Sequence, residues 1–80
     1  MKASIIVMPK RNVLDPQGKA VKHALESMNL TGIKDVRVGK FMVIELEGGD
    51  IAELQNKIDE ACHKLLSNPV IEEYTFEIHE

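Results

Sequence analysis

The sequence predicts an α+β protein whose elements follow one another as β-α-β-α-β. Two segments carry apolar residues at the period of an amphipathic helix, and three carry the β-branched or alternating residues typical of strands. The first of these strands is expected at residues 3–8, which are mostly apolar, and Pro9 ends it. The 80 residues are expected to form one domain, residues 1–80.

The first helix is expected over residues 16–28. Asp15 is a suitable N-cap, and Pro16 suits the first helical position because its missing N–H would have no partner within the helix. Gly18 is unusual in a first turn, since it costs about 1 kcal/mol relative to Ala. A glycine there indicates that another part of the protein approaches the backbone closely. The helix carries one apolar stripe, formed by Val21, Ala24, Leu25 and Met28.

A single long strand is expected from residue 34 to residue 47. Apolar residues stand at alternate positions on both sides of Gly39 and keep one face continuous; they are Val36, Val38, Met42, Ile44 and Leu46. A two-residue hairpin at Gly39-Lys40 is the alternative, and it would change the order to β-α-β-β-α-β. The period favours one strand, because that hairpin would turn the second apolar set to the opposite face.

The second helix is expected to begin after Asp50, whose side chain can cap it. Its inward stripe comprises Ile51, Leu54, Ile58, Ala61, Cys62 and Leu65. The run Ser67-Asn68-Pro69 ends this helix, since the residue before a proline is disfavoured in helical geometry. The last strand is expected over residues 74–79, with alternate side chains buried.

The long middle strand makes a compact monomer difficult. Each helix is expected to serve as a crossover, so that the chain contains two βαβ units that share this strand. A strand of about 14 residues extends about 45 Å, whereas a compact chain of this length has a radius of about 12 Å. We therefore expect a segment-exchanged dimer, in which the first unit of one chain packs against the second unit of another to form a ferredoxin-like lobe.

No set of residues predicts catalysis, and none predicts a bound cofactor or metal. Cys62 and His63 are neighbours on a helix, so their side chains diverge by about 100° and cannot act as a nucleophile and base pair. The histidines His23, His63 and His79 fall on three different elements without the spacing of metal ligands. The sequence therefore favours a binding or structural module over an enzyme with its own active site.

The net charge of −3 opposes attraction to nucleic acid or to anionic membranes. No apolar run approaches the ~20 residues of a membrane span, and the single cysteine cannot form an internal disulfide. The cytoplasm is the expected location.

Three blocks of the sequence resemble the PurS family. They are Leu14-Asp-Pro-Gln-Gly-Lys-Ala-Val21, Asp35-Val-Arg-Val-Gly-Lys40 and Leu65-Leu-Ser-Asn-Pro-Val-Ile-Glu-Glu-Tyr74, and they stand in the family's order. This family is the small subunit of the phosphoribosylformylglycinamidine synthase complex of purine biosynthesis. The resemblance implies a chain without catalytic residues that bridges a glutaminase subunit and a synthetase subunit and helps to pass ammonia between them.

By the same resemblance, the complex uses ATP and glutamine to convert formylglycinamide ribonucleotide into formylglycinamidine ribonucleotide. From the residues themselves we expect a homo-oligomer, either a dimer or a tetramer of paired dimers, with no nucleic-acid partner and no cofactor on this chain. The alternative function, from a different class, is a free-standing ferredoxin-like regulatory module that binds a small ligand at its dimer interface.

The candidate partner interface is formed by polar residues that the predicted core does not need. Arginine often anchors protein interfaces, which makes Arg37 the most informative of them. The alternative for Arg37 is an internal ion pair with Asp15 or Asp35. The full candidate set is Asp15, Gln17, Gly18, Lys34, Arg37, Lys40 and Asn68.

Overall fold

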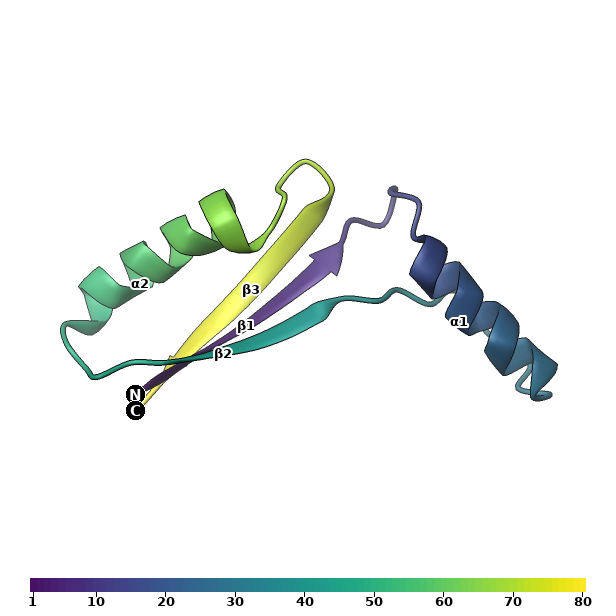
Figure 1. Ribbon diagram of the computed structural model, residues 1–80, viewed down its shortest axis with the longest axis horizontal. Coiled ribbons are helices and arrows are strands. Elements are labelled where there is room, and N and C mark those ends of the chain that lie inside the picture. Colours follow the sequence, from purple (N-terminus) through teal and green to yellow (C-terminus); the bar gives the residue numbers. More distant parts are fainter.

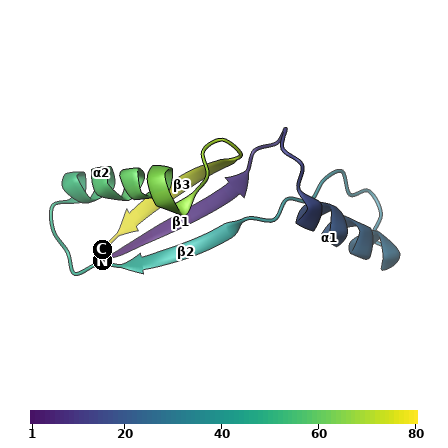
Figure 2. The same ribbon diagram turned by 45° about the horizontal axis from the view of Figure 1, so that its top comes forward.

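The computed structural model describes all 80 residues and confirms the α+β class. A three-stranded sheet carries one helix on one of its faces, and the other helix lies beyond the end of the sheet (Figure 1, Figure 2). In chain order the elements are β1 (Lys2–Pro9), α1 (Pro16–Ser27), β2 (Lys40–Glu45), α2 (Ile51–Ala61), a π-helical turn that continues α2 (Cys62–Leu66) and β3 (Glu72–His79).

The strands lie in the order β2-β1-β3, and both neighbouring pairs are antiparallel. Ile5 of β1 lies opposite Met42 of β2 and Phe76 of β3. Since β2 and β3 both run opposite to β1, they are parallel to each other, and α2 is the crossover between them, as predicted. The predicted crossover by α1 is wrong. This helix lies beyond the end of the sheet rather than over it, so the chain returns along β1 in the opposite direction (Figure 1).

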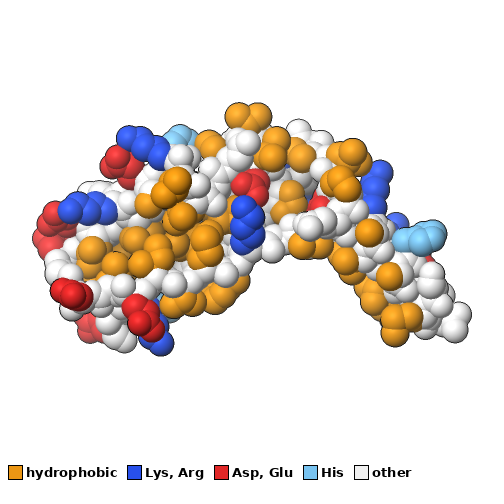
Figure 3. Space-filling model, in the orientation of Figure 1, with side chains coloured by type: hydrophobic (Ala, Val, Ile, Leu, Met, Phe, Trp, Pro, Cys, Tyr) orange, Lys and Arg blue, Asp and Glu red, His pale blue; other side chains and the backbone are white.

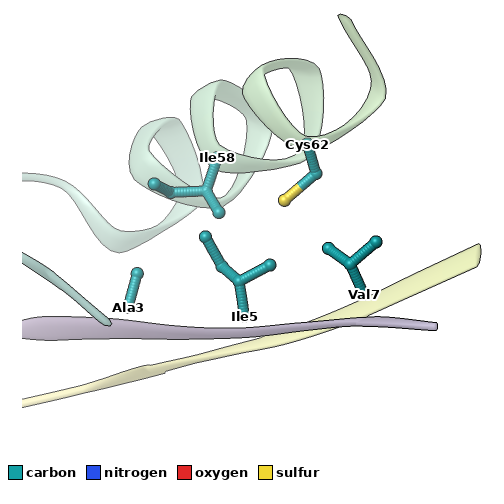
Figure 4. Close-up of a cluster of buried hydrophobic side chains, with 5 residues drawn as sticks. All are labelled: Ala3, Ile5, Val7, Ile58 and Cys62. Carbon is teal, nitrogen blue, oxygen red and sulfur yellow. The ribbon is translucent and has the colours of Figure 1, made fainter. Parts of the chain in front are cut away.

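The core of the protein lies between β1 and the second helix. Five buried side chains form it: Ala3, Ile5 and Val7 from β1, with Ile58 and Cys62 above them (Figure 4). The alternate side chains of β1 face the open side of the sheet, where Ile6 is 44% exposed. The strand is therefore central in the sheet but covered on one face only.

The end of the second helix differs from the prediction at one residue. The sequence places Leu65 on the inward stripe, yet its side chain is 80% exposed. The turn Cys62–Leu66 is π-helical, and the Ser67 N–H donates to the Cys62 carbonyl at 3.0 Å. Because a π-turn spans one residue more than an α-turn, Leu66 rather than Leu65 packs against the core.

The middle strand is shorter than the sequence predicts. Only Lys40–Glu45 pairs with β1, and residues 30–39 run without regular structure from α1 to β2. The pairing stops at Lys40, opposite Val7, although β1 itself continues to Pro9 beside β3. In this register the residues before position 38 lie beyond the end of β1. The alternative hairpin at Gly39-Lys40 is not formed. Gly39 instead lets this segment approach β1, since a Cβ atom there would overlap the Met8 sulfur and the Val7 carbonyl.

The molecule is elongated, with extents of 49 × 25 × 15 Å and a radius of gyration of 16.1 Å. A compact chain of this length would have a radius of gyration of about 12 Å. We call residues 10–39, which contain α1, the arm, and residues 1–9 and 40–80 the body. The arm extends away from the body, so each part keeps a surface that a compact fold would cover (Figure 2).

A hydrogen bond between β3 and α2 provides a test of how the helix is held on the sheet. The Tyr74 hydroxyl donates to the Asp59 carboxylate at 2.6 Å, and this bond raises the pKa of Tyr74 from 10.0 to about 12. The stabilisation should be complete below pH 10 and lost as the pH rises through about 12. We expect Tyr74→Phe to melt at a lower temperature than the wild type at pH 8, and the difference to close above pH 12. A difference independent of pH would contradict this assignment.

Candidate interface at the base of the arm

Asp15 begins α1 and also holds the segment that leaves the arm. One carboxylate oxygen accepts the Gly18 N–H at 3.0 Å, and the other accepts the Val38 N–H at 2.9 Å. These two bonds lower the pKa of Asp15 below its ordinary 3.8, and the bond from Gly18 has the larger effect. Their contribution to stability is therefore present above pH 3.8 and is lost as the pH falls through the lower folded value.

Gly18 is buried against the same segment, which confirms the close approach that the sequence predicts. A Cβ atom at Gly18 would overlap the carbonyl oxygen of Val36. Only glycine leaves room for this contact. The first turn of α1 and the segment before β2 are thus fitted to each other at Gly18 and at Asp15.

Arg37 joins the arm to the body. Its guanidinium donates to the Pro9 carbonyl at 3.0 Å, at the end of β1, and lies 3.9 Å from the Glu73 carboxylate. The internal alternative for Arg37, an ion pair with Asp15 or Asp35, is not formed. The pair with Glu73 is long and partly exposed, so the hydrogen bond to Pro9 is the stronger link.

A hollow of about 200 Å³ lies between the base of the arm and the body, and it gathers three of the candidate residues, Asp15, Gln17 and Lys40. Asn68 is linked to them through Glu72, whose carboxylate accepts the Asn68 N–H at 2.7 Å and lies 4.0 Å from the Lys40 ammonium. Lys34 stands apart. It is exposed and does not line this hollow.

The candidate set omits two residues that take part in this region, Glu72 and Glu73. Glu72 lies beside Lys40, and Glu73 lies beside Arg37. No local spacing in the sequence could have identified these pairs. Each joins residues more than thirty positions apart, which only the antiparallel arrangement of β2 and β3 about β1 brings together.

The cysteine, the only side chain that could act as a strong nucleophile, lies away from this region. Cys62 is buried in the core, and burial, followed by the charge of Asp59, raises the pKa of its thiol. The protonated thiol is a poor nucleophile. No three His, Cys, Asp or Glu side chains lie close enough together to hold a metal ion. Neither helix has the length and apolar character needed to cross a membrane.

Comparison with known proteins gives consistent matches along the whole chain. The family model of PurS, described as phosphoribosylformylglycinamidine (FGAM) synthase, matches residues 2–80. The phosphoribosylformylglycinamidine synthase subunit PurS of Bacillus subtilis is 47% identical over 79 residues, which are 99% of this chain and 93% of the relative. The PurS subunit of Methanocaldococcus jannaschii is 34% identical over 77 residues, 96% of this chain and 93% of the relative.

Solved structures agree with the sequence matches. Bacillus subtilis PurS superposes with a TM-score of 0.87 at 47% identity, covering 99% of this chain and 98% of the other. A chain in the structure of PurLQS from Thermotoga maritima superposes with a TM-score of 0.82 at 33% identity, covering 95% of this chain and 93% of the other. The chain therefore belongs to the PurS family, whose members are subunits of phosphoribosylformylglycinamidine synthase.

Proposed function

We propose that the protein is a non-catalytic subunit of phosphoribosylformylglycinamidine synthase that bridges the glutaminase and synthetase subunits and assists ammonia transfer between them. The observation that carries this proposal is the family relationship along the whole chain, together with the likeness to a chain in PurLQS from Thermotoga maritima. The other subunits would use ATP and glutamine to convert formylglycinamide ribonucleotide into formylglycinamidine ribonucleotide. Ammonia has to be kept from bulk water between two such sites, which gives a sealing subunit a physical purpose.

In this proposal Cys62 does not act as a nucleophile. Its thiol is buried beneath the helix, and its raised pKa keeps it protonated at neutral pH. A free, buried cysteine is also compatible with a reducing compartment, and we place the protein in the cytoplasm.

A second copy of the chain is the proposed occupant of the uncovered arm. The accessible surface is 6090 Å², against about 4,900 Å² for a compact protein of this mass. The excess of about 1,200 Å² is more than the ~800 Å² that one partner buries in a standard interface. Apolar side chains run along α1 in Figure 3, and Val21, Met28 and Leu30 are 41%, 76% and 52% exposed. The proposal is therefore the segment-exchanged dimer, in which each arm packs on the other copy.

The partner subunits are proposed to bind at the base of the arm, on the surface that includes Gln17, Lys40 and Asn68. Gln17 and Lys40 line the same hollow, and Lys40 is 63% exposed in its side chain. Three further candidates, Asp15, Gly18 and Arg37, would support this surface without contacting the partner subunits. Asp15 and Arg37 already form hydrogen bonds within the chain, and Gly18 packs against the backbone of Val36. Lys34 would contribute an exposed cation on the arm.

A reconstitution experiment tests the proposed function. The purified glutaminase and synthetase subunits are assayed for formylglycinamidine ribonucleotide formation, with and without this protein, using either glutamine or ammonium chloride as the nitrogen source. We expect omission of the protein to abolish the glutamine-dependent reaction and to leave the ammonium-dependent one. Equal glutamine-dependent rates with and without the protein would contradict the proposal. Gln17→Ala, an exposed change at the hollow, should reduce the same rate, whereas His23→Ala on the outer face of α1 should not.

A further inference from the structure

The direction of α1 relative to the sheet depends on very few contacts. The helix lies beyond the end of the sheet, and two segments, residues 10–15 and 30–39, connect it to the body (Figure 1). The first segment is fixed to the body by the Lys10 N–H, which donates to the Ile71 carbonyl at 2.8 Å. Arg37 fixes the second segment to the end of β1 through Pro9. Asp15 and Gly18 then fix the start of α1 to that segment, at Val38 and Val36 respectively. The orientation of the arm is therefore set at its base.

The Asp15 carboxylate performs two tasks with two oxygens. Oδ1 caps the first turn of α1 through Gly18, and Oδ2 receives the Val38 N–H from a residue 23 positions away. An asparagine side chain has one acceptor oxygen and one donor NH₂ group. It could cap the helix as well as aspartate does, but its NH₂ group would then face the Val38 N–H, where two donors cannot bond.

We propose that Asp15 is a positioning residue, which sets the direction of the arm by joining the start of α1 to Val38, in addition to capping the helix. An arm already held in one direction loses less conformational entropy when it packs on a partner. Loss of the bond to Val38 should therefore weaken association through the arm. This consequence for association rests on the proposed function, whereas the direction of the arm does not.

The substitution Asp15→Asn separates the two tasks. The variant should keep the helix content of the wild type in circular dichroism, because the cap is retained. Exchange of the Val38 amide hydrogen, followed by NMR, should become about tenfold faster, since this N–H loses its acceptor, while exchange at Gly18 stays within twofold. Asp35→Asn is the matched control, because it removes an exposed carboxylate from the same segment. It should change neither rate.

The direction of the arm is measured by pulsed electron paramagnetic resonance between spin labels at positions 23 and 57. Both native residues, His23 and Lys57, are exposed, and one lies on each side of the base. Labelled chains are diluted with unlabelled protein so that distances within one chain are recorded. We expect one narrow distance distribution in the wild type and in Asp35→Asn, and a broader one in Asp15→Asn. An unchanged distribution in Asp15→Asn, or unchanged exchange at Val38, would overturn the inference.

The activity of the reconstituted enzyme distinguishes this inference from the proposed function. If Asp15→Asn broadens the distance distribution and also lowers the glutamine-dependent rate, both are supported. A broadened distribution with a wild-type rate supports the positioning role and counts against the need for a directed arm in the complex. If the glutamine-dependent rate of the wild-type mixture is the same with and without this protein, the proposed function alone is contradicted. The positioning role is unaffected, because the distance measurement does not use the other subunits.

Discussion

Gly18→Ala is expected to lower the free energy of unfolding by about 2 kcal/mol, as overpacking of a close contact does. The direction is opposite to helix propensity, which favours alanine over glycine by about 1 kcal/mol. The added methyl group would overlap the carbonyl oxygen of Val36, which is backbone and cannot rotate away. Relief of the overlap requires α1 to move off the segment before β2, and this movement also strains the bond between Asp15 and Val38.

Urea denaturation at one fixed protein concentration measures this effect. Lys19→Ala is the matched control, because it introduces the same residue at the next position of the helix, where the side chain is exposed. It should change the free energy of unfolding by less than about 0.5 kcal/mol. If Gly18→Ala proved as stable as the wild type or more stable, glycine would not be needed for the contact with Val36.

Val21→Glu is expected to convert the proposed dimer into a monomer. Val21 lies on the apolar face of α1 and is 41% exposed in the single chain. In the segment-exchanged dimer this face is covered by the other copy, and a buried carboxylate without a partner is strongly disfavoured there. Glutamate is also a better helix former than valine, so dissociation could not be attributed to loss of the helix.

Analytical ultracentrifugation over a range of concentrations measures this change. His23→Glu is the matched control, since it places the same charge on the opposite face of α1, where His23 is exposed. We expect His23→Glu to sediment as the wild type does and Val21→Glu to sediment as a single chain. Equal association of the two variants would show that the apolar face of α1 takes no part in the interface.

Features set by neighbouring residues could be predicted from the sequence. Both helices begin where an aspartate precedes them, and Asp50 accepts the Ala52 N–H at 3.0 Å as a cap. Asn29 has a φ of 68°, the left-handed conformation that asparagine often adopts just after a helix. The need for space at Gly18 could also be predicted, because a glycine in the first turn of a helix is locally unfavourable.

Features set by distant contacts could not be predicted in the same way. The alternation from residue 34 to residue 47 gives the direction of side chains, but the length of β2 depends on which of its residues pair with β1, and this pairing stops at Lys40 opposite Val7. The partners of Arg37 are the Pro9 carbonyl and Glu73, which become neighbours only in the assembled sheet. The exposure of Leu65 follows from a π-turn that the apolar spacing does not reveal.

The mass of the protein in solution shows whether the chain is one half of a paired scaffold. Multi-angle light scattering on the wild-type protein, eluted from a size-exclusion column at micromolar concentration, should give at least twice the 9.0 kDa of a single chain. The value should persist on tenfold dilution, because the interface would bury more than a standard one does. A folded species of 9.0 kDa across the same concentrations would rule out the paired scaffold.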